Sequence, residues 1–174
     1  LDAKTTLSLG AVNSVNWARV LAQIVYYFYA ALRFDSPVAI AVPTGNFGNI
    51  CAGYLARMMG APISRLILAT NQNDILARFF NTGVYERGSV HQTHSPSMDI
   101  QVASNFERFV YYRAGQDPDR LKAFMETFAE KGRAELGNQG AVDSCFVAAS
   151  ASNDETLATI REVYSKHGYI LDPH

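Results

Sequence analysis

Short apolar runs alternate with stretches of helical periodicity along most of the chain. The apolar runs predict strands at residues 38–42, 65–70 and 141–148, and the periodic stretches predict helices at residues 13–32, 50–59, 75–82 and 153–166. Strands that alternate with helices at this spacing usually lie parallel in one sheet. The pattern therefore predicts an α/β fold, with a parallel sheet of three or more strands and flanking helices.

The first predicted helix begins at Asn13 or Ser14 and carries one apolar and one polar stripe. The apolar stripe consists of Trp17, Leu21, Ile24, Phe28 and Leu32, and the polar stripe of Asn16, Arg19 and Gln23. The polar stripe is either a solvated face or part of an anion site, in which the helix start, Asn13, Ser14 and Arg19 bind phosphate oxygens. Periodicity alone favours the solvated face.

The middle of the chain interrupts the alternation. Residues 88–104 show little periodicity, whereas residues 105–112 and 118–131 return to a helical pattern with many aromatic side chains. We interpret residues 1–174 as one partial α/β domain with a loop and helical insertion at about 88–135. His91, His94 and Asp99 lie in this loop, but no further ligand cluster accompanies them, so we predict no metal site.

Composition limits the partners that the chain can have. Its 174 residues are 48% hydrophobic, and 15 basic and 16 acidic side chains give a net charge of −1. This is enough for one domain with a sizeable core, but it gives no basic footprint for nucleic acid or an anionic membrane. Every apolar stretch is interrupted before the ~20 residues of a membrane span. Cys51 and Cys145 are predicted to be reduced core thiols of a cytoplasmic protein.

The glycine-rich turn after the first predicted strand carries the strongest chemical signal. It reads Pro43-Thr44-Gly45-Asn46-Phe47-Gly48-Asn49 and leads directly into a helix. Such a turn is either a plain strand–helix connection or an anion site, in which unpaired N–H groups and the helix dipole attract a phosphate. The glycine spacing matches neither a Walker A loop nor a dinucleotide fingerprint. A small phosphorylated cofactor therefore fits better than a nucleotide.

Four sequence stretches together resemble the threonine synthase family of fold type II (tryptophan-synthase-β-like) pyridoxal-phosphate enzymes. These stretches are residues 12–19, the glycine-rich turn at 43–49, Ala69-Thr70-Asn71-Gln72-Asn73-Asp74, and Ser95-Pro96-Ser97-Met98-Asp99-Ile100 with Ser104-Asn105-Phe106-Glu107-Arg108. The final Leu171-Asp172-Pro173-His174 is also similar to the family. The resemblance covers nearly the whole chain, and its fourth stretch is the most specific.

The resemblance implies a reaction and a division of roles. The family converts O-phospho-L-homoserine and water to L-threonine and inorganic phosphate, with pyridoxal 5′-phosphate as cofactor. By this resemblance, backbone N–H groups of Gly45, Asn46, Phe47, Gly48 and Asn49 bind the cofactor phosphate. Asn13, Ser14, Asn16 and Arg19 would bind the substrate phosphate.

The resemblance also implies that part of the catalytic machinery lies outside this chain. A pyridoxal-phosphate enzyme needs a lysine that bonds to the cofactor, and the chain has only Lys4, Lys122, Lys131 and Lys166. None of the four lies in the Phe-Lys-Asp-type context of the family. We therefore expect a central fragment, cut at both ends, that does not itself form threonine.

Two other functions remain open from the sequence. A threonine or serine dehydratase has a similar glycine-rich turn but acts on an unphosphorylated amino acid, which leaves Arg19 without a phosphate to bind. A non-catalytic phosphate-binding module would have lost the lysine during evolution.

Overall fold

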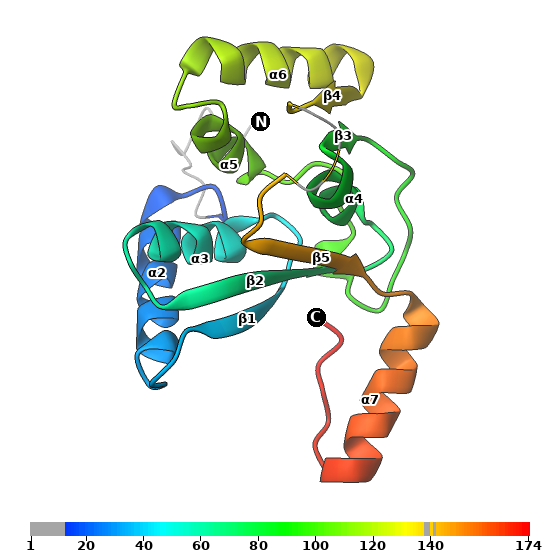
Figure 1. Cartoon of the computed structure of the whole chain (residues 1–174). Coiled ribbons are helices and arrows are strands. Elements are labelled where there is room, and N and C mark those ends of the chain that lie inside the picture. The colour runs from blue at the N-terminus through cyan, green and yellow to red at the C-terminus, as the bar shows by residue number, and fades with distance from the viewer. Residues whose placement is uncertain (1–12, 138–139, 141) are drawn as a thin grey trace, which may run out of the picture.

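The computed structural model describes residues 13–137, 140 and 142–174, and Figure 1 shows their arrangement. Lys4 and the first residue of the predicted strand at 141–148 lie outside this part of the chain. The helices are α2 (Trp17–Ala31), α3 (Gly48–Met58), α4 (Ile75–Thr82), the single-turn η1 (Pro96–Met98), α5 (Phe106–Arg113), α6 (Pro118–Lys131) and α7 (Asn153–His167). The strands are β1 (Val38–Pro43), β2 (Ile63–Thr70), β3 (Val84–Glu86), β4 (Arg133–Glu135) and β5 (Phe146–Ser150).

The main sheet has the order β1-β2-β5, and both of its strand pairs are parallel. This confirms the predicted α/β class. Helices α3 and α4 cover one side of the sheet, with α5 and α6 farther out, as Figure 1 shows. On the other side, α7 extends away from the sheet and the C-terminal tail runs back towards it.

The ends of β1 and β2 lie side by side, which brings their following loops together. Pro43 is paired with Ala69 in the sheet register. The amide of Thr44 then donates to the carbonyl of Ala69 across 2.7 Å, so the pairing continues one residue beyond β1. In parallel sheets, ligands bind beyond the carboxyl ends of the strands. The glycine-rich turn and the loop at residues 71–74 therefore share the edge where a ligand site is expected.

An aromatic cluster forms the core between the sheet and the helical insertion. Phe47 lies at its centre and is 1% exposed. Its ring lies 5.7 to 6.4 Å from four other rings, those of Phe80, Phe106, Phe109 and Phe146. The aromatic residues of α5 that face inward therefore form core and fix Phe47, the residue that joins the glycine-rich turn to α3.

The first helix differs from its prediction in its start and in its buried face. Asn13 accepts a hydrogen bond from the amide of Val15 through its side chain, which makes a turn of residues 13–16. Asn16 then caps α2 by accepting from the amide of Ala18. The buried residues are Val20, Ile24, Tyr27 and Ala31, whereas Trp17, Leu21 and Leu32 of the predicted stripe are at least 43% exposed. The helix is apolar on most of its circumference, so periodicity alone did not identify the packed face.

Two further features were absent from the prediction. Strands β3 and β4 form a short antiparallel pair that encloses residues 87–132. Strand β5 begins at Phe146 and not at 141, because Asp143 forms a turn by accepting from the amide of Cys145.

None of the helices in the described ranges combines the length and the apolar character that crossing a bilayer requires.

Candidate functional site

The glycine loop, residues 44–49, is held at its start by the sheet. Thr44 is buried, and its hydroxyl donates to the carbonyl of Val42 across 2.7 Å. The single hydrogen-bond donor of this side chain is therefore used within the protein and is not free to bind a ligand. At the other end, Phe47 has a φ of 63°, a left-handed conformation that is unusual for a residue with a side chain, and Gly48 starts α3. The loop thus reverses sharply between a strand and a helix.

Successive peptide groups of this loop present unpaired donors. The backbone N–H groups of residues 45–50 donate to no acceptor within the described part of the chain. The first N–H groups of a helix lack intrahelical acceptors, and those of α3 continue the series that the loop begins. A concave run of N–H groups at a helix start attracts anions by its aligned dipoles. The loop therefore has the donor set of an anion site.

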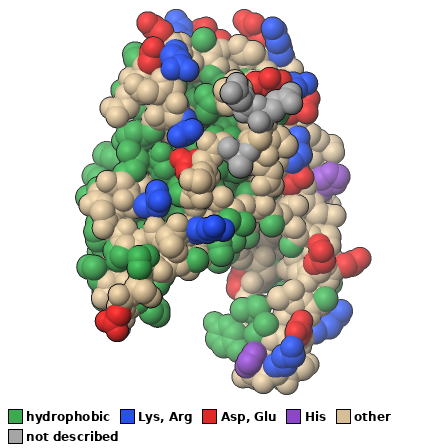
Figure 2. All heavy atoms as spheres, in the orientation of Figure 1, with side chains coloured by type: hydrophobic (Ala, Val, Ile, Leu, Met, Phe, Trp, Pro, Cys, Tyr) green, Lys and Arg blue, Asp and Glu red, His purple; other side chains and the backbone are tan. Residues whose placement is uncertain are grey.

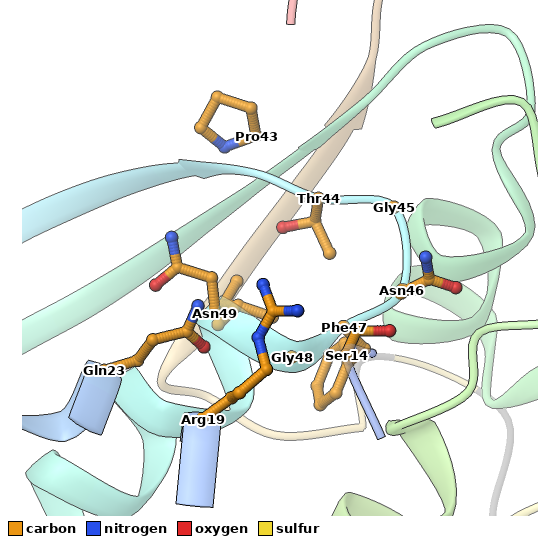
Figure 3. A pocket seen from close by; sticks show the side chains of 11 residues that line it. Ser14, Arg19, Gln23, Pro43, Thr44, Gly45, Asn46, Phe47, Gly48 and Asn49 are labelled. Carbon is orange, nitrogen blue, oxygen red and sulfur yellow. The ribbon is translucent and has the colours of Figure 1, made fainter. Parts of the chain in front are cut away.

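A pocket of about 150 Å³ lies in front of these donors, as Figure 3 shows. It is lined by residues 43–50 together with Ser14, Arg19 and Gln23. The Arg19 side chain extends from α2 towards the loop. Within the described residues its guanidinium has neither an ion-pair partner nor a side-chain hydrogen bond. The predicted polar stripe thus contributes two of its residues, Arg19 and Gln23, to the same pocket as the glycine loop.

Asn13 and Asn16 do not line this pocket. Their side-chain oxygens stabilise the turn and the cap of α2. Ser14 lines the pocket from the same turn, and its hydroxyl lies 3.3 Å from that of Ser104. The pocket therefore brings together residues 45–49, Ser14 and Arg19, whereas Asn13 and Asn16 are not among its lining residues.

A buried asparagine connects the two sides of the pocket. Asn105 is 0% exposed, and its side-chain amide donates to the carbonyls of Ser14 at 3.0 Å and Asn46 at 3.2 Å. Its backbone amide also donates to Asn46. Arg108 donates to the Asn105 side-chain oxygen and to the carbonyl of Val15. In the sequence, Asn105 and Arg108 were notable only as members of a family motif, because the burial of Asn105 and its long-range contacts are visible only in the structure.

A second polar network fastens residues 88–101 to the carboxyl end of β2. Asn71 and Asn73, both buried, donate to one oxygen of Asp99 at 2.8 and 3.0 Å. Thr93 donates to Asp99 through its hydroxyl and its amide. Burial raises the pKa of Asp99, but the Thr93 and Asn71 hydrogen bonds outweigh it and hold that pKa below its usual value. Asp99 therefore serves as an acceptor within this loop network.

The two cysteines are further titratable groups of the core. Both are free and buried. Burial raises the pKa of Cys51 to about 12, and burial followed by the negative charge of Asp143 raises that of Cys145 to about 12. They are core thiols, as predicted, and remain protonated at neutral pH.

A second pocket of about 320 Å³ adjoins the first at Pro43. The C-terminal tail, α7 and the end of β2 enclose it, and Thr70, Ser95, Asp172 and His174 are among its lining residues. The buried Thr70 hydroxyl has no hydrogen-bond partner within the described residues. The tail motif therefore lies beside the loop network, at the same edge of the sheet as the glycine loop.

Comparisons with known proteins show which chains are similar in sequence and fold. The chain is 48% identical over 171 residues to threonine synthase from Pseudomonas aeruginosa, covering 95% of this chain and 36% of that protein. A crystal structure of pyridoxal-phosphate-bound threonine synthase from Brucella melitensis matches with a TM-score of 0.91 at 48% identity, covering 100% of this chain and 39% of that one. The yeast threonine synthase structure matches with a TM-score of 0.82 at 41% identity, over 95% of this chain and 36% of the yeast chain. No family model matches the chain.

The fold and the glycine loop therefore define a part of the large domain of fold type II pyridoxal-phosphate enzymes. The chain spans less than two-fifths of the length of the relatives named above. Within that class, it corresponds to a segment of threonine synthase, and the resemblance found in the sequence is confirmed.

Proposed function

We propose that this chain is the phosphate-binding segment of a pyridoxal-phosphate-dependent threonine synthase, a lyase that converts O-phospho-L-homoserine and water to L-threonine and inorganic phosphate. The observation that carries the proposal is the run of unpaired N–H groups at residues 45–50, which faces a pocket that also holds a guanidinium. Both features suit phosphate oxygens.

The residues present fit a cofactor that carries a phosphate. A Cβ atom on Gly45 would lie 3.2 Å from the Met98 Cα, and one on Gly48 would lie 3.2 Å from the Asn105 side-chain nitrogen, so a side chain at either position would require its neighbour to shift. Backbone N–H groups of Gly45 to Asn49 would hold the cofactor phosphate without any charged side chain. The bound cofactor would supply an electron sink for carbanion chemistry, while this chain supplies binding and orientation.

The substrate phosphate is assigned to the other wall of the pocket. Ser14 and Arg19 would bind it directly, with Arg19 supplying a planar, permanently charged fork. Asn13 and Asn16 would act indirectly, because their side-chain oxygens stabilise the turn that carries Ser14 and the start of α2. A dehydratase acting on an unphosphorylated amino acid would have no group for Arg19 to bind.

The lysine that bonds to the cofactor would come from outside the described residues. Lys122, Lys131 and Lys166 lie on α6 and α7 with exposed side chains, and none of them lines the glycine-loop pocket. We therefore infer that the chain alone does not form threonine. The threonine-biosynthetic role also suits the cytoplasmic location predicted from the sequence.

The direct test is an assay of the full-length protein that contains this chain. We expect equal amounts of inorganic phosphate and threonine from O-phospho-L-homoserine. Formation of 2-oxobutyrate from threonine, without phosphate release, would contradict the proposal and identify a dehydratase. Binding of pyridoxal phosphate without either reaction would indicate a non-catalytic binding module.

A further inference from the structure

Asn105 contacts both halves of the glycine-loop pocket, although it does not line it. We infer that Asn105 is a positioning residue that fixes the orientation of the Asn46–Phe47 peptide and joins the two phosphate-binding walls. This inference rests on the proposed function, because it assigns a role within the same site.

The first step concerns the direction of one peptide group. Two donors of Asn105, its backbone and side-chain nitrogens, hold the carbonyl of Asn46 at 3.1 and 3.2 Å. The peptide bond is trans, so its N–H points opposite to its carbonyl. The N–H of Phe47 is thereby directed away from Asn105 and joins the unpaired donors of residues 45–50. Without this restraint the peptide could rotate and place a carbonyl oxygen among them.

The second step concerns strain at Phe47. A residue with a side chain is strained in the left-handed conformation, and it persists there only when its surroundings determine it. The aromatic cluster anchors the Phe47 ring, and Asn105 anchors the carbonyl that precedes it. Phe106, whose ring lies 5.8 Å from that of Phe47, directly follows Asn105, so one segment supplies both restraints.

The third step concerns the opposite wall. The same side-chain nitrogen of Asn105 donates to the carbonyl of Ser14, at the start of the polar stripe. Arg108 fixes which end of the amide faces these carbonyls, because its Nε–H donates to the amide oxygen across 3.1 Å. One buried amide therefore sets the separation between the glycine loop and the turn that carries Ser14. Loss of this amide should weaken binding on both walls.

The test uses the full-length protein and compares Asn105→Leu with wild type. Leucine is close in size to asparagine but has no polar atoms, so it removes the restraint without adding charge. We expect the Kd for pyridoxal phosphate to rise at least tenfold and the Kd for inorganic phosphate, measured by competition with the substrate, to rise at least fivefold. The ³¹P resonance of bound cofactor should also shift, since it reports the donors around the phosphate. Gln101→Met is the matched control, because Gln101 is a buried amide whose partners are in residues 73–89.

The outcomes separate the inference from the proposed function. Unchanged Kd values and an unchanged ³¹P resonance in Asn105→Leu would overturn the positioning role, even if wild type is a threonine synthase. A wild-type protein that does not bind pyridoxal phosphate would instead overturn the proposed function. If Asn105→Leu does not fold, Arg108→Met is the second variant, because it removes the donor that binds the Asn105 side-chain oxygen. A two- to fivefold rise in the cofactor Kd is then expected, and no rise would contradict the inference.

Discussion

At the residue scale, Gly48 is the point where the glycine loop becomes helix α3. A Cβ atom added at this position would lie 3.2 Å from the side-chain nitrogen of Asn105, beside the unpaired N–H groups of residues 45–50. Because glycine has no side chain, these N–H groups are not covered at this position. A side chain here would press against the Asn105 amide, directly beside these donors.

We predict that Gly48→Asp raises the Kd for pyridoxal phosphate at least a hundredfold in the full-length protein. The variant places a carboxylate where a phosphate is expected, and like charges repel strongly in a partly enclosed site. Absorbance titration with the cofactor measures the effect. Gly88→Asp is the control, since it makes the same change in a loop outside the pocket. Normal cofactor occupancy in Gly48→Asp would refute the assignment of the loop.

Arg19 is expected to act on the substrate and not on the cofactor. We predict that Arg19→Ala raises KM for O-phospho-L-homoserine ten- to a hundredfold, while the absorption spectrum of bound cofactor stays the same. A charge-assisted, two-pronged contact to phosphate is lost, but the backbone donors of the loop remain. Arg33→Ala, beyond the end of α2, is the control. A changed spectrum together with an unchanged KM would mean that the two phosphates are assigned to the wrong walls.

At the scale of elements, the carboxyl end of β2 holds the long loop in place through polar contacts. Residues 88–101 contain only the single helical turn η1, yet Asn71, Asn73, Thr93 and Asp99 bind one another across this loop. Because Asp99 accepts four hydrogen bonds from these residues, its charge is central to the loop conformation.

We predict that Asp99→Asn speeds backbone hydrogen exchange of residues 88–101 about five- to tenfold at pH 7. The pKa of Asp99 is lowered in the folded loop, so its contribution is complete above the usual value of 3.8 and is lost as the pH falls through the lower, folded value. The difference between variant and wild type should therefore shrink below pH 3.8. Mass spectrometry at pH 7 and pH 3 measures it, with Asp119→Asn on α6 as control. An equal difference at both pH values would argue against this role.

Local patterns were sufficient for the strands of the main sheet and the longer helices, and insufficient for the short strands β3 and β4 and for the contacts between elements. The strand–turn–helix at residues 38–58 has an apolar run, a glycine-rich turn and a periodic segment, and each appears in the structure close to its predicted place. The pairing of β3 with β4 brings together two three-residue strands that are separated by residues 87–132, and no local pattern indicates it. The face of α2 that packs inward was also undetermined, because a helix that is apolar nearly all round gives no strong periodic signal.

For the candidate site too, residue types were predictable from the sequence, whereas the contacts between distant residues were not. The glycine loop and Arg19 were recognisable from residue types, since glycines before a helix and a lone arginine on a polar stripe carry chemical meaning alone. That both lie in one pocket, with Asn105 behind them, depends on contacts across about 90 residues of sequence. Separate roles for Ser14 and its neighbours Asn13 and Asn16 also required the turn geometry.

At the scale of the whole molecule, the outer face of α2 carries an apolar surface. Leu21, Val25, Tyr26, Tyr29 and Leu32 are 47% to 68% exposed. Figure 2 shows hydrophobic side chains along the side of the molecule where α2 lies. Continuous apolar surface of this kind promotes association.

We predict that the 174-residue chain, produced alone, self-associates through this face. Val25→Lys with Tyr29→Lys should lower the associated fraction several-fold, since two charges would interrupt the apolar surface. Sedimentation velocity measures the change. Gln72→Lys with Gln92→Lys adds the same charge at exposed polar positions and should leave association much closer to wild type. A monomeric wild-type chain would contradict the prediction.

The residues that line the glycine-loop pocket also determine how its affinity for phosphate should depend on pH. Among the described residues that line it, Arg19 is the only one with a charged side chain, and guanidinium groups stay protonated in proteins. Peptide N–H groups do not titrate at all. The described lining of the pocket therefore keeps the same charge between about pH 5 and pH 9. Any change in phosphate affinity over that range should follow the second ionisation of the ligand itself, near pH 6.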